Sequence, residues 1–240
     1  MAYAIRSALA AAIMLLAALP VARAADAVDL LLVLAADVSR SVDHEKFLLQ
    51  REGYAAAIAD PAVLQSILSG PNRRIAVSFV EWSGFGAQKT VVDWMVIDGP
   101  EAAKRFGDLV IEAPRSFSGR TSISGAIEFG FKRLTEAPYT ALRRTIDLSG
   151  DGTNNAGRDP KLARDEVVAK DVTINGLVIH SDRPIPWNPE HTNPPGGLAN
   201  YYRDNVIGGP GAFVMAAQDF KSFGRALIRK LIAEIAFNVP

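Results

Sequence analysis

Apolar residues occur in two patterns along the chain. Residues 28–36 form a short, nearly continuous apolar run, and residues 74–83, 143–149 and 172–179 also read as strands. Such runs are typical of strands that lie inside a parallel sheet, where helices cover both faces. Between these segments, apolar residues recur every three or four positions, which predicts amphipathic helices. Strands that alternate with helices predict an α/β fold.

The helical segments have recognisable starts and apolar faces. Asp60 precedes Pro61, and Asp159 precedes Pro160, and each pair is typical of a helix start. Residues 100–112 also read as a helix. Apolar faces are predicted for three further helices, formed by Phe47, Tyr54 and Ile58, by Ile123, Ile127, Phe131 and Leu134, and by Phe220, Phe223, Leu227, Leu231 and Ile235.

One connection is too short for a helical crossover. Residues 89–97 read as a strand, and only a turn around Gly84 and Gly86 separates them from the strand at 74–83. These two strands must therefore form an antiparallel hairpin. With a short strand at 212–216, the prediction is an open, doubly wound, Rossmann-like sheet of about six strands whose third strand is antiparallel, flanked by helices.

Residues 181–210 differ in composition from the rest of the chain. They contain several prolines, paired glycines, and the aromatic residues Trp187, Tyr201 and Tyr202. A loop of this length in a compact domain is usually functional or disordered. The aromatic residues favour order, so we expect an ordered long loop at 181–210.

The first 24 residues have the features of a secretory signal peptide. Arg6 precedes an apolar run at residues 8–19, and small residues at Ala22 and Ala24 specify cleavage after Ala24. The alternative is a membrane anchor, but the run is shorter than the roughly 20 residues that a span needs. We expect one exported domain over residues 25–240, in the periplasm or outside the cell, with no membrane span after cleavage.

Composition narrows the possible functions of this exported domain. Residues 25–240 contain 24 basic and 26 acidic residues, a net charge of −2, which argues against a nucleic-acid partner. The chain has no cysteine, and its histidines His44, His180 and His191 are not at metal-ligand spacing. A structural zinc site is therefore not expected.

Oxygen-bearing side chains occur where three predicted elements reach one edge of the sheet. Asp37, Ser39 and Ser41 follow the first strand, Thr121 precedes a helix, and Asp151 follows the fourth strand. Doubly wound sheets bind ligands at the carboxyl ends of their strands. Taken singly, these residues are ordinary helix caps and turn residues. Together, the hydroxyls and carboxylates match the ligands of a hard divalent cation such as Mg²⁺.

This five-residue pattern resembles the metal-ion-dependent adhesion site (MIDAS) of von Willebrand factor type A domains. The resemblance covers residues 28–236 and implies the strand order 3-2-1-4-5-6. It implies magnesium, or manganese in some members, bound directly by Ser39, Ser41 and Thr121 and largely through water by Asp37 and Asp151. The segments "DVSRSVD", "SGDGTNN" and "VIGGPGAF" also resemble segments of a group of exported bacterial A-type domains with no assigned function.

The resemblance implies a binding module whose metal coordinates an acidic residue of a partner protein that the sequence does not identify. One alternative is an envelope structural or assembly factor with a stabilising metal. An enzyme, such as a metal-dependent hydrolase, is not favoured. No G-x-S-x-G elbow is present, Ser39 replaces the second carboxylate of a phosphoryl-accepting Asp37, and no general base is evident.

Several residues beside the predicted site have two interpretations. Trp82 and Phe85 would lie near its rim and could contact a partner, but Trp82 could instead pack under the hairpin. Asn154 and Asn155 could help to orient the loop or contact the ligand, or they could be simple turn residues. Asp147 lies in a predicted central strand, so its carboxylate needs a polar partner or an exposed face.

Overall fold

The computed structural model describes residues 26–180 and 188–236. Its centre is one sheet in the order β3-β2-β1-β4-β5-β6. Only β3 is antiparallel to its neighbour, so the predicted order and the predicted hairpin are both confirmed. The strands are β1 (Ala27–Asp37), β2 (Ile75–Trp82), β3 (Gln88–Ile97), β4 (Thr140–Gly150), β5 (Thr173–Ile179) and β6 (Val214–Ala217).

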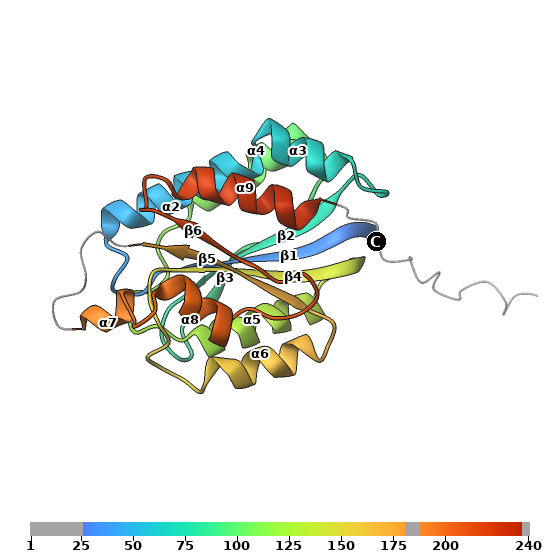
Figure 1. Cartoon of the computed structure of the whole chain (residues 1–240). Coiled ribbons are helices and arrows are strands. Elements are labelled where there is room, and N and C mark those ends of the chain that lie inside the picture. Colours follow the sequence, from blue (N-terminus) through green and yellow to red (C-terminus); the bar gives the residue numbers. More distant parts are fainter. Residues whose placement is uncertain (1–25, 181–187, 237–240) are drawn as a thin grey trace, which may run out of the picture.

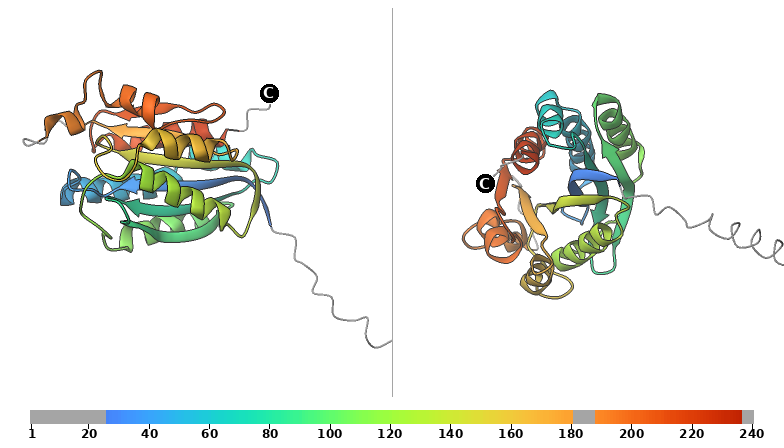
Figure 2. Two further views of the ribbon diagram at one scale, coloured as in Figure 1. Left: turned by 90° about the horizontal axis from the view of Figure 1, so that it is seen from below. Right: turned by 90° about the vertical axis from the view of Figure 1, so that its right-hand side faces the viewer.

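Helices cover both faces of this sheet, as Figure 1 shows. One layer contains α2 (His44–Ile58), α3 (Pro61–Leu68), α4 (Pro100–Glu112) and α9 (Phe223–Ile235). The other layer contains α5 (Ile123–Thr135), α6 (Pro160–Val168) and α8 (Leu198–Asn205), with the short α7 (Pro189–Thr192) beside the sheet edge. The right-hand view of Figure 2 also shows the two layers on opposite sides of the sheet.

The alternation of side chains along β1 divides the core between these layers. Leu30, Leu32 and Leu34 pack with α2, α4 and α9, whereas Leu31 and Val33 pack on the opposite face. All of them are buried, which explains why β1 reads as a continuous apolar run rather than an alternating one. The predicted helix caps are also present: Asp60 accepts a hydrogen bond from the Ala62 amide, and Asp159 accepts one from the Lys161 amide.

A buried charge network joins α9 to the middle of the sheet. Lys230 Nζ lies 2.7 Å from Asp147 Oδ1 in β4 and donates a hydrogen bond of 2.5 Å to Glu234 Oε1. Asn175 in β5 donates to the same Glu234 oxygen at 2.7 Å. The partner that Asp147 requires is therefore a lysine of the last helix.

The prediction of a long loop at 181–210 is wrong for part of that range. Residues 188–210 contain α7 and α8, and Leu198 and Tyr202 of α8 are buried. The short helices escape prediction because Pro189 and the glycines at 196 and 197 interrupt the apolar periodicity. Residues 1–24, including the predicted signal peptide, and residues 181–187, including Trp187, lie outside the described part of the chain.

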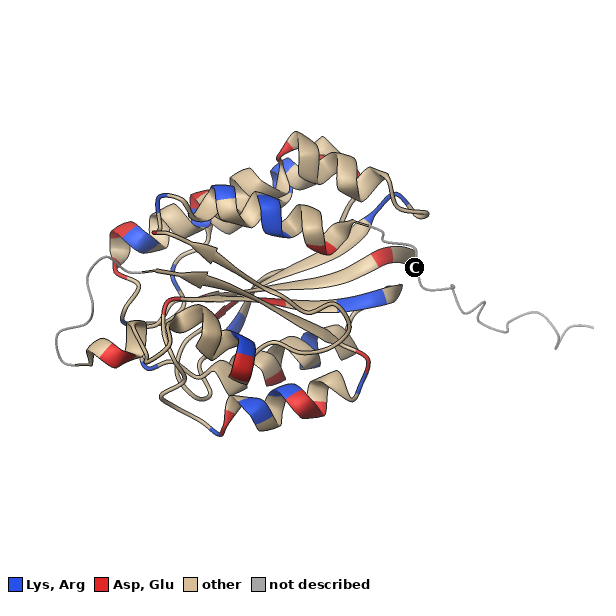
Figure 3. Ribbon diagram, viewed as in Figure 1, with Lys and Arg blue, Asp and Glu red and all other residues tan. Residues whose placement is uncertain are grey.

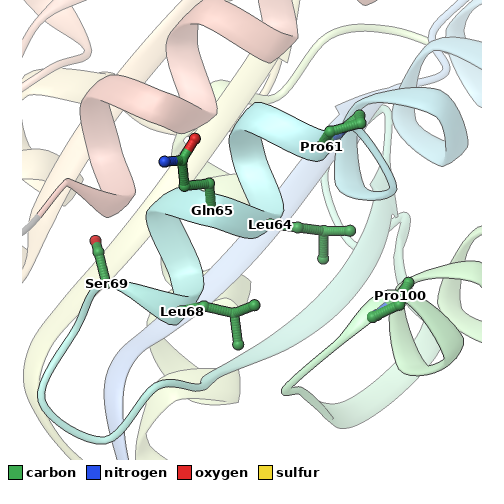
Figure 4. A pocket seen from close by; sticks show the side chains of 6 residues that line it. All are labelled: Pro61, Leu64, Gln65, Leu68, Ser69 and Pro100. Atoms are coloured by element: carbon green, nitrogen blue, oxygen red, sulfur yellow. The ribbon is translucent and has the colours of Figure 1, made fainter.

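The outer surface shows few features that point to a ligand. Both signs of charge are interspersed on the outer helices (Figure 3). An open groove lies between α3 and the start of α4 (Figure 4), lined by Pro61, Leu64, Gln65, Leu68, Ser69 and Pro100. Within the described ranges, none of the helices has the length and apolar character that crossing a membrane requires.

Candidate functional site

The three predicted segments meet at the carboxyl edge of the sheet. Asp37 is the last residue of β1, and Asp151 directly follows β4, which pairs with β1 in parallel. The loop before α5 is tied to both neighbours, because the Arg40 amide donates to Gly119 O at 2.9 Å and the Asn155 amide donates to Thr121 O at 2.9 Å. The fold therefore brings all five predicted site residues to one end of the molecule.

A chain of hydrogen bonds links four of these five residues. Asp37 Oδ1 accepts a hydrogen bond from the Ser39 amide at 2.7 Å, and the Ser39 and Ser41 hydroxyl oxygens lie 3.0 Å apart. Ser41 Oγ in turn donates to Asp151 Oδ1 at 2.5 Å. The two serine hydroxyls thus lie beside each other and next to Asp151.

Two asparagines hold Thr121 and the start of α5 in place. Asn155 Oδ1 accepts the Thr121 amide at 2.9 Å, and Asn154 Oδ1 accepts the Ile123 amide at 2.8 Å. The orienting interpretation of both residues is therefore confirmed. Arg115 has a similar role on the first loop, where its guanidinium donates to the carbonyl oxygens of Val38 and Ser39.

The carboxylates of the site are electrostatically unfavourable in the bare protein. Asp37 and Asp151 are both fully buried. Burial, followed by the charge of Asp151, raises the pKa of Asp37 to about 8. Burial also raises the pKa of Asp151, although the Ser41 hydrogen bond and Lys46 act in the opposite direction. The ammonium of Lys46 lies 3.8 Å from Asp151 Oδ2 and donates to Ser41 O at 2.9 Å.

This arrangement fits a divalent cation. Among the described residues, Asp37 Oδ2 and Asp151 Oδ2 are buried without a hydrogen-bond partner. A buried, unpaired carboxylate oxygen is costly, and a bound cation would remove that cost. Within the same described ranges, no group of three or more His, Cys, Asp or Glu side chains is placed to hold a metal. Hydroxyl oxygens can therefore complete the coordination shell of an ion, and Ser39, Ser41 and Thr121 provide them.

Two further side chains reach the site from the segment after β5. His191 of α7 is 5% exposed, and its Nε2 lies 3.3 Å from Thr121 Oγ1. Its Nδ1 lies 3.3 Å from Thr153 Oγ1 and 3.4 Å from Asn155 Nδ2. Burial lowers the pKa of His191, while the charge of Asp151 acts to raise it.

The second side chain is Tyr202 of α8, whose hydroxyl is buried and has no hydrogen-bond partner among the described residues. A Cβ atom on Gly150 would lie 2.4 Å from this hydroxyl and 3.2 Å from Asp37 Oδ2, so only glycine fits between them. The positions of His191 and Tyr202 in the sequence did not predict that their side chains reach the site. The unusual composition of residues 181–210 was the one available signal.

The rim of the site is formed by exposed side chains and does not include Trp82. Trp82 is fully buried and packs with the α5 layer, so the packing interpretation is confirmed and contact with a partner is excluded. Phe85 in the β2–β3 turn is 75% exposed and lies against Gly157. The neighbouring side chains of Arg40 and Arg120 are also exposed. The rim therefore presents an aromatic ring and two cations.

Comparison with protein families gives one match over nearly the whole described chain. The family described as "Protein of unknown function (DUF1194)" matches residues 27–239. The chain belongs to this family. None of the curated proteins compared with this DUF1194 chain matches it significantly.

Solved structures show that this DUF1194 chain has a von Willebrand factor type A fold. Proximal thread matrix protein 1 from the mussel byssus superposes with a TM-score of 0.58 and 16% identity, over 89% of this chain and 49% of that one. The pilus adhesin SpaC from Lactobacillus rhamnosus GG gives a TM-score of 0.60 and 12% identity, over 89% and 31%. A von Willebrand factor type A protein from Catenulispora acidiphila gives 0.54 and 13%, over 88% and 42%.

The chain spans half or less of the length of these three solved proteins. At such low identity the likeness shows the fold alone. Proximal thread matrix protein 1 has also been solved with a zinc-occupied MIDAS motif, at 16% identity to this chain.

Proposed function

We propose that this protein is an exported, metal-dependent binding module. In this proposal Ser39, Ser41 and Thr121 hold a divalent ion, magnesium or manganese, and Asp37 and Asp151 balance its charge. An acidic side chain of a partner protein completes the coordination. The observation that carries the proposal is the pair of buried aspartates linked through the Ser39 amide and the hydroxyls of Ser39 and Ser41, with one oxygen of each carboxylate lacking a hydrogen-bond partner among the described residues.

Charge supports an acidic partner. Two carboxylates neutralise a divalent ion, but Lys46 beside Asp151 and the exposed Arg40 and Arg120 leave the mouth of the loaded site positive. Neutral hydroxyl ligands also leave the ion electrophilic, so an additional anionic oxygen would bind well. A carboxylate of a partner meets both conditions.

The solved neighbours are consistent with this role and with export. One is described as a pilus adhesin, and another as a byssus thread protein that has been solved with metal at its MIDAS motif. A catalytic role is not proposed, because Thr121, whose hydroxyl lies 3.3 Å from His191 Nε2, is assigned here to the metal site. An envelope assembly factor whose metal only stabilises the loops remains the alternative that the first experiment below distinguishes.

Capture of the partner is expected to require both the ion and Asp151. The test is a pull-down from envelope extract with residues 25–240 as bait, in magnesium and again in EDTA. Only the wild-type protein in magnesium should retain the partner, because Asp151→Ala removes a charge that balances the ion.

Asp98→Ala is the matched control, since Asp98 is exposed and follows β3 at the opposite edge of the sheet. Asp98→Ala should capture as well as the wild type. Identical capture by wild type, Asp151→Ala and EDTA-treated protein would leave the metal with a structural role at most.

Phe85 is expected to contribute to the contact with the captured partner. Exposed aromatic residues often dominate interfaces, so Phe85→Ser should weaken binding by about tenfold or more. Because the ring is 75% exposed, folding stability should change by less than ~0.5 kcal/mol. Binding is measured by surface plasmon resonance and stability by urea unfolding.

Leu142→Ser is the control for Phe85→Ser, because Leu142 is 78% exposed near the amino end of β4, away from the site. An equal loss of partner binding in both variants would show that Phe85 has no specific role.

A further inference from the structure

The imidazole of His191 lies within the candidate site rather than beside it. A Cβ atom on Gly152 would lie 2.3 Å from His191 Nε2, so the ring lies directly against the residue that follows Asp151. The Thr153 amide also donates to His191 O at 2.8 Å, which fixes the backbone of α7 to the Asp151 loop. The ring is therefore held at this place by contacts on both its backbone and its side chain.

In each of two pairs of polar atoms, the spacing suits two neighbouring ligands of an ion. Two ligands at about 2.1 Å from an ion lie roughly 3.0 Å apart at a right angle and roughly 3.4 Å apart at the tetrahedral angle. The distance from Ser39 Oγ to Ser41 Oγ is 3.0 Å, and that from Thr121 Oγ1 to His191 Nε2 is 3.3 Å. The second distance is longer than usual for a hydrogen bond.

The other ring nitrogen has the environment of a metal-binding histidine. Such histidines use one nitrogen for the metal, and the other donates to an oxygen that fixes the tautomer. His191 Nδ1 lies 3.3 Å from Thr153 Oγ1, which can accept its proton, and 3.4 Å from Asn155 Nδ2, which donates to the ring only in the other tautomer. In the tautomer with the proton on Nδ1, the lone pair is on Nε2, the nitrogen that lies beside Thr121.

We propose that His191 Nε2 is a direct ligand of the ion, beside Thr121, and that the site prefers first-row transition ions such as Mn²⁺ and Zn²⁺ over Mg²⁺. This inference rests on the proposed function. Imidazole nitrogen binds transition ions well, whereas Mg²⁺ takes oxygen ligands. A nitrogen ligand among hydroxyls and carboxylates therefore shifts selectivity away from magnesium.

The coordination is tested on wild-type protein loaded with Mn²⁺. Electron spin echo envelope modulation should show the ¹⁴N coupling of a directly bound imidazole, and the signal should vanish in His191→Ala. Calorimetry should show Mn²⁺ and Zn²⁺ bound at least about tenfold more tightly than Mg²⁺ by the wild type. In His191→Ala the transition ions should lose about tenfold or more, with little change for Mg²⁺.

His44→Ala is the control, because His44 is an exposed histidine and its removal should leave the ¹⁴N signal intact. Bound Mn²⁺ without a ¹⁴N coupling in the wild type, or equal affinities for Mn²⁺ and Mg²⁺, would overturn the inference and leave the proposed function standing. A wild-type protein that binds none of the three ions would contradict the proposed function itself.

Discussion

Replacement of Lys230 by methionine is expected to destabilise the fold by about 3–5 kcal/mol, the usual cost of breaking a buried ion pair from one side. Lys230 is fully buried, and its ammonium contacts both Asp147 Oδ1 and Glu234 Oε1. Without it, two neighbouring carboxyl groups would remain in the core with no cation. Chemical unfolding in urea measures the loss.

The effect should also depend on pH. Burial, followed by the charge of Asp147, already raises the pKa of Glu234 to about 8. Folded Glu234 thus keeps its proton up to about pH 8, whereas the unfolded carboxyl releases it near pH 4. Over this range the folded state holds more protons than the unfolded state, so stability falls as the pH rises. Because Lys230 acts to lower this pKa, its loss should extend the decline to higher pH.

Two further variants make the result interpretable. Arg229→Met changes the adjacent, exposed residue of α9 and should alter stability by less than ~0.5 kcal/mol. Lys230→Met combined with Asp147→Asn should recover part of the loss, because the carboxylate of Asp147 that Lys230 no longer pairs is removed. A loss below ~1 kcal/mol in Lys230→Met alone would contradict the structural role given to this network.

The Lys230 network shows where prediction of the fold from sequence succeeded and where it stopped. The β2–β3 hairpin followed from a connection too short for a crossover, and the strand order was implied by the resemblance to von Willebrand factor type A domains. Asp147 was recognised as a residue in need of a partner. Lys230 was not found, because Lys230 and Glu234 four residues later on an amphipathic helix look like an ordinary surface pair.

Prediction of the candidate site had a similar limit. Asp37, Ser39, Ser41, Thr121 and Asp151 lie at strand and helix boundaries, where local patterns and parallel topology bring them to one edge. His191 and Tyr202 reach the same place from short helices after β5. Their approach depends on close packing against Gly152 and Gly150, which no periodic pattern in the sequence encodes.

Replacement of Asp37 by asparagine is expected to abolish metal binding and at the same time to stabilise the metal-free protein. Asparagine keeps the oxygen that accepts the Ser39 amide but removes a charge that is fully buried and close to Asp151. The folded Asp37 carboxyl holds its proton up to about pH 8, whereas the unfolded one releases it near pH 4. Stability of the metal-free wild type should therefore fall as the pH rises through this interval.

Asp37→Asn should flatten that decline, with a gain of a few kcal/mol at neutral pH, since each pKa unit corresponds to roughly 1.4 kcal/mol. Urea unfolding in EDTA from pH 5 to pH 8 measures the gain, calorimetry measures metal binding, and Asp98→Asn serves as the exposed control. Unchanged metal affinity in Asp37→Asn would contradict the proposed metal site. A gain in stability together with lost binding would mean that this edge of the sheet keeps two destabilising carboxylates for the ion that they bind.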